Sequence, residues 1–310
     1  MKIIQANSKL FPLIEQFIKP YEEKCIFLAS QVRRHSDKIW LITESSQSRG
    51  CEKADILGVL YIDSSVFHYI PEPEKIDPAV IEAALLREPQ GSQTTAKSQQ
   101  TPAQGQQIPA SLPHPAPHRP IHCISGERQG TEYLVNLLKK SGKEPYQVNH
   151  YKIMTCEKAV NPPEELQNDD AIIRCTENDM EVLFPIQKKY LSEEVAPFGK
   201  KVTDAEVSIG LRQTLKNQLC LALITNDEIA AKANTNAIGL DWLQLGGVYT
   251  HPLYRRNGYA WHLVAALCRR AEKAQKKSAL FVKDINVPAM ELYKKCGFKE
   301  GPLYEIAYFD

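Results

Sequence analysis

The sequence predicts an α/β protein with a mixed sheet, divided into two domains. Short β-rich runs alternate with amphipathic helical patterns along most of the chain, which is typical of this fold class. The 310 residues also exceed the usual size of a single domain. An apolar strand at 242–250 leads through a glycine-containing loop into a long amphipathic helix. Together these observations predict a ligand-binding C-terminal domain and a smaller N-terminal α/β domain.

The N-terminal domain is expected over residues 1–158. Its elements are a hairpin, a strand, a helix and a strand, at 38–43 with 56–63, 121–125, 131–140 and 146–154. Residues 88–120 interrupt this domain, because they are rich in Gln, Pro, Ser and Thr and hold only Ile108 and Leu112 as large aliphatic side chains. Such a segment buries too little apolar surface to offset its ordering entropy, so we expect a flexible loop. A proline-motif ligand for a partner domain is the alternative.

A linker at 159–169 separates the domains, because Pro162 and Pro163 break any regular element there. The second domain, 170–310, begins with a short strand at 172–173. Thr176 has the residue type of a helix N-cap, and Asp179 lies in the first turn. The further elements, in order, are helices at 176–190 and 202–218, joined by a turn at 191–197, and strands at 219–224, 229–236 and 242–250.

The helix that follows Gly258 is amphipathic. Its apolar stripe has spacings of three and four and consists of Trp261, Val264, Ala265, Cys268, Ala271 and Ala274. The basic residues of the opposite face are interpreted as a solvated surface rather than a nucleic-acid site. A strand at 279–282 follows. Asn286 is then expected to cap a short helix that Gly297 ends.

Composition excludes several classes of partner. The hydrophobic fraction of 43% and the net charge of +1 are those of an ordinary globular protein, so we expect no nucleic-acid partner. No apolar stretch approaches the roughly 20 residues that span a bilayer. None of the eight cysteines forms a C-x-x-C pair or has metal-ligand spacing to a histidine. We therefore expect a cytoplasmic protein with reduced thiols and neither a membrane partner nor a metal; a catalytic cysteine is the alternative.

The loop at 255–260, Arg-Arg-Asn-Gly-Tyr-Ala, predicts a phosphate-bearing ligand. It presents backbone N–H groups at a helix N-terminus, where the helix dipole adds positive potential. The surrounding segment, 247–298, resembles the acetyl-CoA-binding core of the N-acetyltransferase superfamily known as GNAT, whose loop is written Q/R-x-x-G-x-G/A. The preceding strand ends in V-Y-T-x-P at 248–252, and the pattern N-x-x-A-x-x-L-Y-x-x-x-G-F follows at 286–298.

The resemblance implies a GNAT fold for the C-terminal half, with acetyl-CoA as cofactor. It implies that the backbone of Val248 and Tyr249 pairs with the pantetheine arm, and that Asn286 hydrogen-bonds this arm. It also implies that Tyr293 protonates the leaving thiolate, for which a phenol of pKa about 10 is suited. The residues implied for the pyrophosphate are Arg255, Arg256, Asn257, Gly258, Tyr259 and Ala260. A core role for Tyr293, a capping role for Asn286 and solvated arginines are the simpler interpretations.

The acceptor side is less well defined. The strand at 242–250 carries no carboxylate between its ends, although family members often place a base there. Glu193 or Glu194, in the turn between the first two helices, is favoured for binding a cationic acceptor. The remaining candidates for the acceptor site or its base are Glu228, Lys232, Asn234, Thr235 and Asp241.

The N-terminal half has the element order of a partial GNAT domain but lacks the cofactor loop, since Gly126 to Gly130 does not match the pattern. We interpret the chain as a tandem GNAT protein with a degenerate first copy; an unrelated accessory domain is the alternative. The expected activity is transfer of an acetyl group from acetyl-CoA to a primary amine of a small metabolite, in a ternary complex. A protein amine as acceptor, or a catalytically silent acyl-CoA-binding module, are the competing hypotheses. The oligomeric state stays open.

Overall fold

The computed structural model describes residues 1–44, 56–86, 120–167, 169–196 and 199–310. Within these ranges, twelve strands form one mixed sheet in the order β1-β2-β3-β4-β5-β12-β6-β11-β10-β9-β8-β7. The strands are β1 (Lys2–Gln5), β2 (Ile39–Thr43), β3 (Ile56–Ile62), β4 (Ser65–Tyr69), β5 (Cys123–Glu127), β6 (Gln147–Cys156), β7 (Ala171–Cys175), β8 (Cys220–Thr225), β9 (Glu228–Ile238), β10 (Trp242–Thr250), β11 (Lys277–Lys283) and β12 (Lys299–Tyr308).

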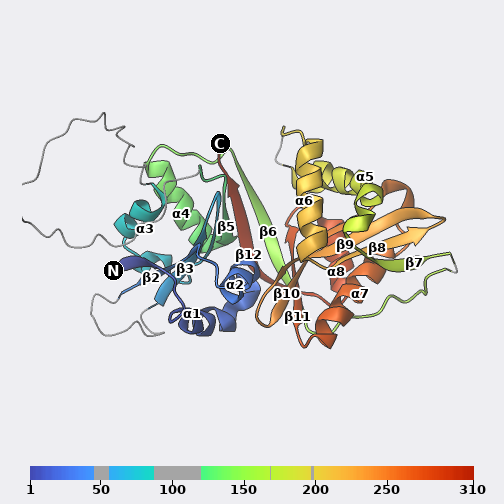
Figure 1. Cartoon of the computed structure of the whole chain (residues 1–310), viewed down its shortest axis with the longest axis horizontal. Coiled ribbons are helices and arrows are strands. Elements are labelled where there is room, and N and C mark those ends of the chain that lie inside the picture. The colour runs from blue at the N-terminus through green and yellow to red at the C-terminus, as the bar shows by residue number, and fades with distance from the viewer. Residues whose placement is uncertain (45–55, 87–119, 168, 197–198) are drawn as a thin grey trace, which may run out of the picture.

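Helices cover both faces of this sheet (Figure 1). The α-helices are α1 (Phe11–Ile18), α2 (Ile26–Arg33), α3 (Pro78–Leu85), α4 (Arg128–Lys140), α5 (Met180–Tyr190), α6 (Asp204–Asn217), α7 (Tyr259–Lys273) and α8 (Val287–Lys295). In the C-terminal half, α7 and α8 pack on one face of the sheet, and α5 and α6 pack on the other. Among the described residues, no helix combines the length and the apolar character that crossing a bilayer requires.

The strand order repeats after six strands. Strands β1 to β6 correspond, in order, to strands β7 to β12. Exchanging each strand's label with that of its counterpart reproduces the same sheet order, read in the opposite direction. The two parallel pairs, β4 with β5 and β10 with β11, correspond under this exchange of labels. The helices correspond as well: two follow the first strand of each set, one precedes the fifth strand and one follows it. The described chain therefore consists of two units of like topology, β1 to β6 and β7 to β12.

The last strand of each unit lies within the other unit's part of the sheet. Strand β12 lies between β5 and β6, and β6 lies between β12 and β11. Figure 1 shows both strands in the middle of the molecule, between the two groups of helices. The first unit ends with β6 at Cys156 and the second begins with β7 at Ala171, while the sheet continues across both units.

The helices and strands expected from the sequence are all present among the described residues, with ends that differ by a few residues. The hairpin of β2 and β3 forms, and a capping box of Thr176 and Asp179 begins the first helical segment of the second unit. The elements β1, α1, α2, β4, α3 and β12 were not expected. The segment 88–120 lies, apart from Pro120, outside the described residues.

The apolar stripe of α7 is largely as expected. Val264, Ala265, Cys268 and Ala271 are buried, whereas Ala274 is exposed just beyond the end of the helix. The seven cysteines among the described residues are free thiols.

Glu22 joins the two units. Its buried carboxylate accepts backbone hydrogen bonds from Leu240 and Asp241, in the loop before β10, and from Trp242, the first residue of β10, at 2.6, 2.8 and 3.3 Å. Burial is the main cause that raises the pKa of this carboxyl, although the three N–H groups act in the opposite direction. This loop is also held by the ammonium of Lys276, which donates to the carbonyl oxygens of residues 239 and 240. The first unit therefore fixes the start of the strand that forms the candidate site.

Candidate functional site

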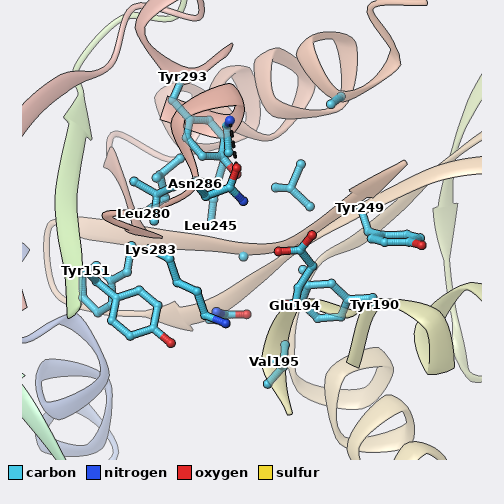
Figure 2. Close-up of a pocket in the computed structure, with 18 of the residues that line it drawn as sticks. Tyr151, Tyr190, Glu194, Val195, Leu245, Tyr249, Leu280, Lys283, Asn286 and Tyr293 are labelled. Carbon is cyan, nitrogen blue, oxygen red and sulfur yellow. Dashed lines mark hydrogen bonds between the residues drawn. The ribbon is translucent and has the colours of Figure 1, made fainter. Parts of the chain in front are cut away.

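The candidate site is a cleft formed where β10 and β11 separate. The two strands pair in parallel only over 242–245 and 277–280. Beyond this point a cavity of about 530 Å³ opens between them, bounded by α8 and by the turn after α5 (Figure 2). A second cavity of about 480 Å³ lies beside α5 and α6 and shares Tyr190, Val195, Asn236 and Gly247 with the first. The cleft therefore continues onto the face of the sheet that α5 and α6 cover.

A β-bulge in β10 creates the separation. The pairing of β10 with β9 shifts between Gly246 and Tyr249, so the two residues between them lie opposite a single residue of β9. Gly247 has a φ of +58°, which residues with side chains rarely adopt. A Cβ there would lie 1.9 Å from Oδ1 of Asn234 and 2.8 Å from Nζ of Lys232. Only glycine satisfies both the backbone angle and the space at this position.

Lys232 of β9 stabilises the bulge through hydrogen bonds of its ammonium group. Its side chain is only 1% exposed, and its ammonium donates to the carbonyl oxygen of Gly247 at 2.9 Å and to Oδ1 of Asn234 at 3.1 Å. The ammonium also lies 4.7 Å from the ring centroid of Tyr190, a cation–π distance. Burial lowers the pKa of Lys232 to about 8, against the opposing influence of the Cys220 and Cys175 thiols.

This hydrogen bond fixes the direction of one peptide group. In a trans peptide the carbonyl and the following N–H point in opposite directions. Because the carbonyl of Gly247 points at Lys232, the N–H of Val248 points away from it. Both residues line the cleft, so this N–H is a preorganised donor in its wall.

The loop at 255–260 has the geometry of an anion site. Arg256 and Gly258 have φ angles of +72° and +74°, and α7 begins directly after them. Within the described ranges, the backbone N–H groups of Arg256, Asn257 and Gly258 donate to no protein acceptor. Arg255 and Ala260 line the cleft, whereas the residues between them border a separate cavity of about 590 Å³ beside residues 162–167 and Asp170.

Asn286 and Tyr293 lie on the α8 wall of the cleft (Figure 2). Asn286 caps α8, because its Oδ1 accepts from the N–H of Ala289 at 3.2 Å; its amide NH2 is a donor left for a ligand. Tyr293 is buried, 8% exposed. Burial is the main cause that raises its pKa, with smaller contributions from Tyr190, the Cys296 thiol and Glu194. The hydroxyl therefore stays protonated at neutral pH and is able to donate.

The structure distinguishes the two acidic candidates of the turn. Glu193 faces the loop at 255–260: its carboxylate accepts from the hydroxyl of Tyr249 at 2.8 Å and pairs with Arg255 at 3.2 Å. Burial is the main cause that raises the pKa of Tyr249 to about 12, and the hydrogen bond to Glu193 acts in the same direction. Glu194 instead lines the cleft and is turned toward Tyr293 in Figure 2.

The other acceptor-side candidates have structural partners. Asn234 is buried and holds Lys232, although it also borders the second cavity. Thr235 bonds Gln218, and Glu228 accepts from the hydroxyl of Tyr254. Asp241 pairs with Lys19 of the first unit. None of these last three side chains lines either of the two joined cavities within the described part of the chain.

Several lining residues were missed by the sequence interpretation. Tyr190 ends α5, Lys283 ends β11, and Tyr151 and Tyr308 come from the exchanged strands β6 and β12. Their only sequence signal is strand or helix periodicity, which says nothing of the wall they form together.

The first unit fills the equivalent place with His68. Strands β4 and β5 pair in parallel over 65–67 and 123–125, and then separate as β10 and β11 do. The ring of His68 occupies this point: a Cβ on Gly126 would lie 2.2 Å from its Nε2, which bonds Oγ1 of Thr131 at 2.9 Å. Burial lowers the pKa of His68 to about 3, so the ring is neutral.

In the described chain, no three potential metal ligands form a group that could hold an ion.

Comparisons with known proteins agree with this geometry. Residues 186–298 match the family model of the acetyltransferase (GNAT) family. No curated protein matches the sequence significantly. Three solved structures share the fold along nearly the whole chain. They are a Drosophila protein (13% identity, TM-score 0.62, covering 99% of this chain and 98% of that chain), a GCN5-related N-acetyltransferase from Sphaerobacter thermophilus (11%, 0.53, 98% and 93%) and a GNAT-family acetyltransferase from Colwellia psychrerythraea (11%, 0.51, 100% and 100%).

At these identities the structural likeness establishes the fold, and the family model establishes the relationship of the segment that forms the cleft. Residues 186–298 of this chain thus match the GNAT acetyltransferase family model, and this segment forms most of the cleft.

Proposed function

We propose that the protein transfers an acetyl group from acetyl-CoA to a primary amine, most directly that of a small metabolite, within a ternary complex. One observation carries the proposal. The cleft between β10 and β11 runs from Arg255 and Ala260, at the two ends of the loop before α7, to Tyr293, and it opens onto the opposite face of the sheet. A donor and an acceptor are thus able to approach one point from two sides.

The donor half of the site would be held mainly by backbone. The loop from Arg256 to Ala260 would bind the pyrophosphate, because its N–H groups and the α7 dipole favour anions. The backbone of Val248 and Tyr249, which lies beyond the paired part of β10 and β11, would pair with the pantetheine arm, and the amide NH2 of Asn286 would donate to it. Arg255 is shared with Glu193, so its charge acts on the cofactor only in part.

The reaction would proceed by direct attack. The neutral amine attacks the thioester carbonyl carbon, forming the C–N bond and an oxyanion that the N–H of Val248 stabilises. The C–S bond then breaks, and Tyr293 gives its proton to the leaving thiolate. Glu194 would first bind the cationic acceptor, whose ammonium releases one proton to solvent to give the neutral amine. The second proton, lost once the C–N bond has formed, passes to Glu194 directly or through water, and Tyr293 regains its proton from solvent.

A catalytically silent acyl-CoA-binding module is the competing proposal. It is favoured by one observation: β10, described over its whole length, carries no carboxylate that could act as base. A protein amine is the alternative acceptor.

The deciding experiment measures thiol release from acetyl-CoA against a panel of small amines and lysine-containing peptides. Calorimetry of CoA binding to the same preparation is the control. Release with a small amine supports the proposal, and release with peptides alone would assign a protein acceptor. CoA binding without release for any amine would favour the silent module, and absence of CoA binding would contradict both.

A further inference from the structure

We propose that the acceptor carries a carboxylate beside its amine, as an amino acid does, and that Lys283 binds this carboxylate while Glu194 binds the amine. This inference rests on the proposed acetyl transfer, and it names the class of substrate for that site.

Lys283 is a charged side chain without a protein partner in the cleft wall. It is half-buried at the end of β11 and lines the cavity. Across the part of the chain that the structure describes, its ammonium makes no hydrogen bond or ion pair, whereas Lys277 at the start of the same strand pairs with Glu157. A half-buried ammonium loses hydration without compensation unless a ligand supplies an acceptor. Its position therefore favours an anionic group on the bound acceptor.

Glu194 is the opposite charge on the opposite wall. It is half-buried in the turn after α5 and, unlike Glu193, has no hydrogen-bond or ion-pair partner among the described residues. Figure 2 shows Glu194 and Lys283 on different sides of the cleft, each with its charged end turned to the interior. Since the two do not pair with each other, a ligand with a cation and an anion is complementary to both.

The order of the two charges suits the chemistry. Glu194 lies on the side of Tyr293 and Asn286, where the thioester would react, and its charge acts on the Tyr293 hydroxyl. Lys283 lies on the far side, beside Tyr151. An amine held by Glu194 would thus meet the thioester, while the carboxylate is kept away from it. The reverse orientation would place an anion against the developing oxyanion.

Strands β6 and β12, each of which lies within the other unit's part of the sheet, form the wall of the cleft beside Lys283. Tyr151 of β6 is the register partner of Lys283, and its hydroxyl interacts with that of Tyr308 on β12. Both phenols line the cleft. They offer hydrogen bonds to a carboxylate that Lys283 holds by charge. The cavity of about 530 Å³ must also hold the acetyl group and part of the pantetheine, which favours a small acceptor.

The test compares acceptors that differ only in the carboxylate. The amino acids would be assayed beside their amides and the amines that lack the carboxyl group, at saturating acetyl-CoA. For the wild type we expect a kcat/KM at least tenfold higher for one or more amino acids than for the matched amide. In Lys283→Met this preference should be lost through KM of the amino acid, with the amide and acetyl-CoA unaffected. Lys283→Arg should restore it.

A matched variant, Lys277→Met, changes a lysine of the same strand outside the cleft and should keep the preference. An equal or higher kcat/KM for amides in the wild type would overturn the inference while leaving acetyl transfer intact. So would a Lys283→Met variant in which amino acid and amide lose activity equally, or in which the KM of acetyl-CoA rises.

A binding measurement separates this inference from the proposed function. Amino acids and their amides would be titrated into protein saturated with CoA, which needs no turnover. Binding of an amino acid that depends on Lys283 supports the acceptor site even where no amine is acetylated. No amino acid binding better than its amide contradicts it. Unchanged CoA affinity and melting temperature of the Lys283 variants establish that they are folded.

Discussion

The ammonium of Lys232 donates a hydrogen bond to the carbonyl oxygen of Gly247, with 2.9 Å between the two atoms. A buried lysine thereby meets a bulged backbone, and the carboxylate partner that buried lysines usually need is replaced by a carbonyl, an amide oxygen and the face of Tyr190. The charge is consequently costly. Its value to the protein is the fixed direction of the peptide between Gly247 and Val248.

The lowered pKa of Lys232 predicts how the free energy of unfolding depends on pH. The pKa of Lys232 is about 8 in the folded protein and about 10.4 in an unfolded chain. Between these values the unfolded state holds the proton and the folded state does not, so stability rises with pH. Relative to Lys232→Met, the free energy of unfolding of the wild type should increase by up to about 3 kcal/mol from pH 8 to pH 10.5. Urea unfolding across this range measures it, and a constant difference between the proteins would contradict it.

Substitution of Gly247 should close the cleft. The change Gly247→Ala places a Cβ 1.9 Å from Asn234 at a φ of +58°, so β9 or the bulge must move. We expect a loss of stability of about 1–3 kcal/mol and at least tenfold weaker CoA binding, measured by denaturation and calorimetry. The control is Gly210→Ala on α6, where a Cβ meets nothing within 4 Å. It should keep CoA affinity and not destabilise the protein, because alanine favours helix.

Loss of the Tyr293 hydroxyl should affect chemistry more than binding. The change Tyr293→Phe keeps the buried ring and removes the proposed acid, so turnover should fall roughly 10²-fold while the Kd of CoA stays within a factor of two to three. Tyr304→Phe is the control: this ring is equally buried but bonds Ser125 away from the cleft, so it should lower stability and leave turnover unchanged. Unaltered turnover in Tyr293→Phe would remove the acid role.

Gly258 tests the anion loop. Its φ of +74° strains any side chain by about 1–2 kcal/mol, although the space around it is open. The change Gly258→Leu should abolish measurable CoA binding, because a side chain there interferes with the approach of phosphate to the backbone. Gly142→Leu has a similar φ of +80° and equally open space but lies after α4. It should show the same strain with normal CoA binding; retained binding in Gly258→Leu would exclude this loop from the pyrophosphate site.

The elements that carry the proposed donor half of the site were predictable because their signals are local. The strand, the glycine loop and the cap at Asn286 lie within about fifty residues, and each has a physical requirement that the residue type reveals. Glu193 and Glu194 were not separable, because neighbours in one turn differ only in direction, which the irregular turn after α5 decides. Likewise, Gly247 has no sequence feature that identifies it as the bulge.

The remaining part of the site depends on pairing between distant segments. Strand β12 contains Gly301 and Pro302, which weaken its strand pattern, and its place between β5 and β6 follows from contacts more than 140 residues apart in the chain. Tyr151 and Lys283 become neighbours only through such pairing. No periodicity within a single segment contains this information.

The exchange of β6 and β12 also bears on how the protein acquires its structure. Strand β5 cannot gain its inner neighbour until the chain has been synthesised through Tyr308, so the first unit cannot fold to completion ahead of the second. We therefore expect no stable isolated half and one cooperative unfolding transition, with the near- and far-ultraviolet signals changing together. Two separate transitions would show that the halves mature independently.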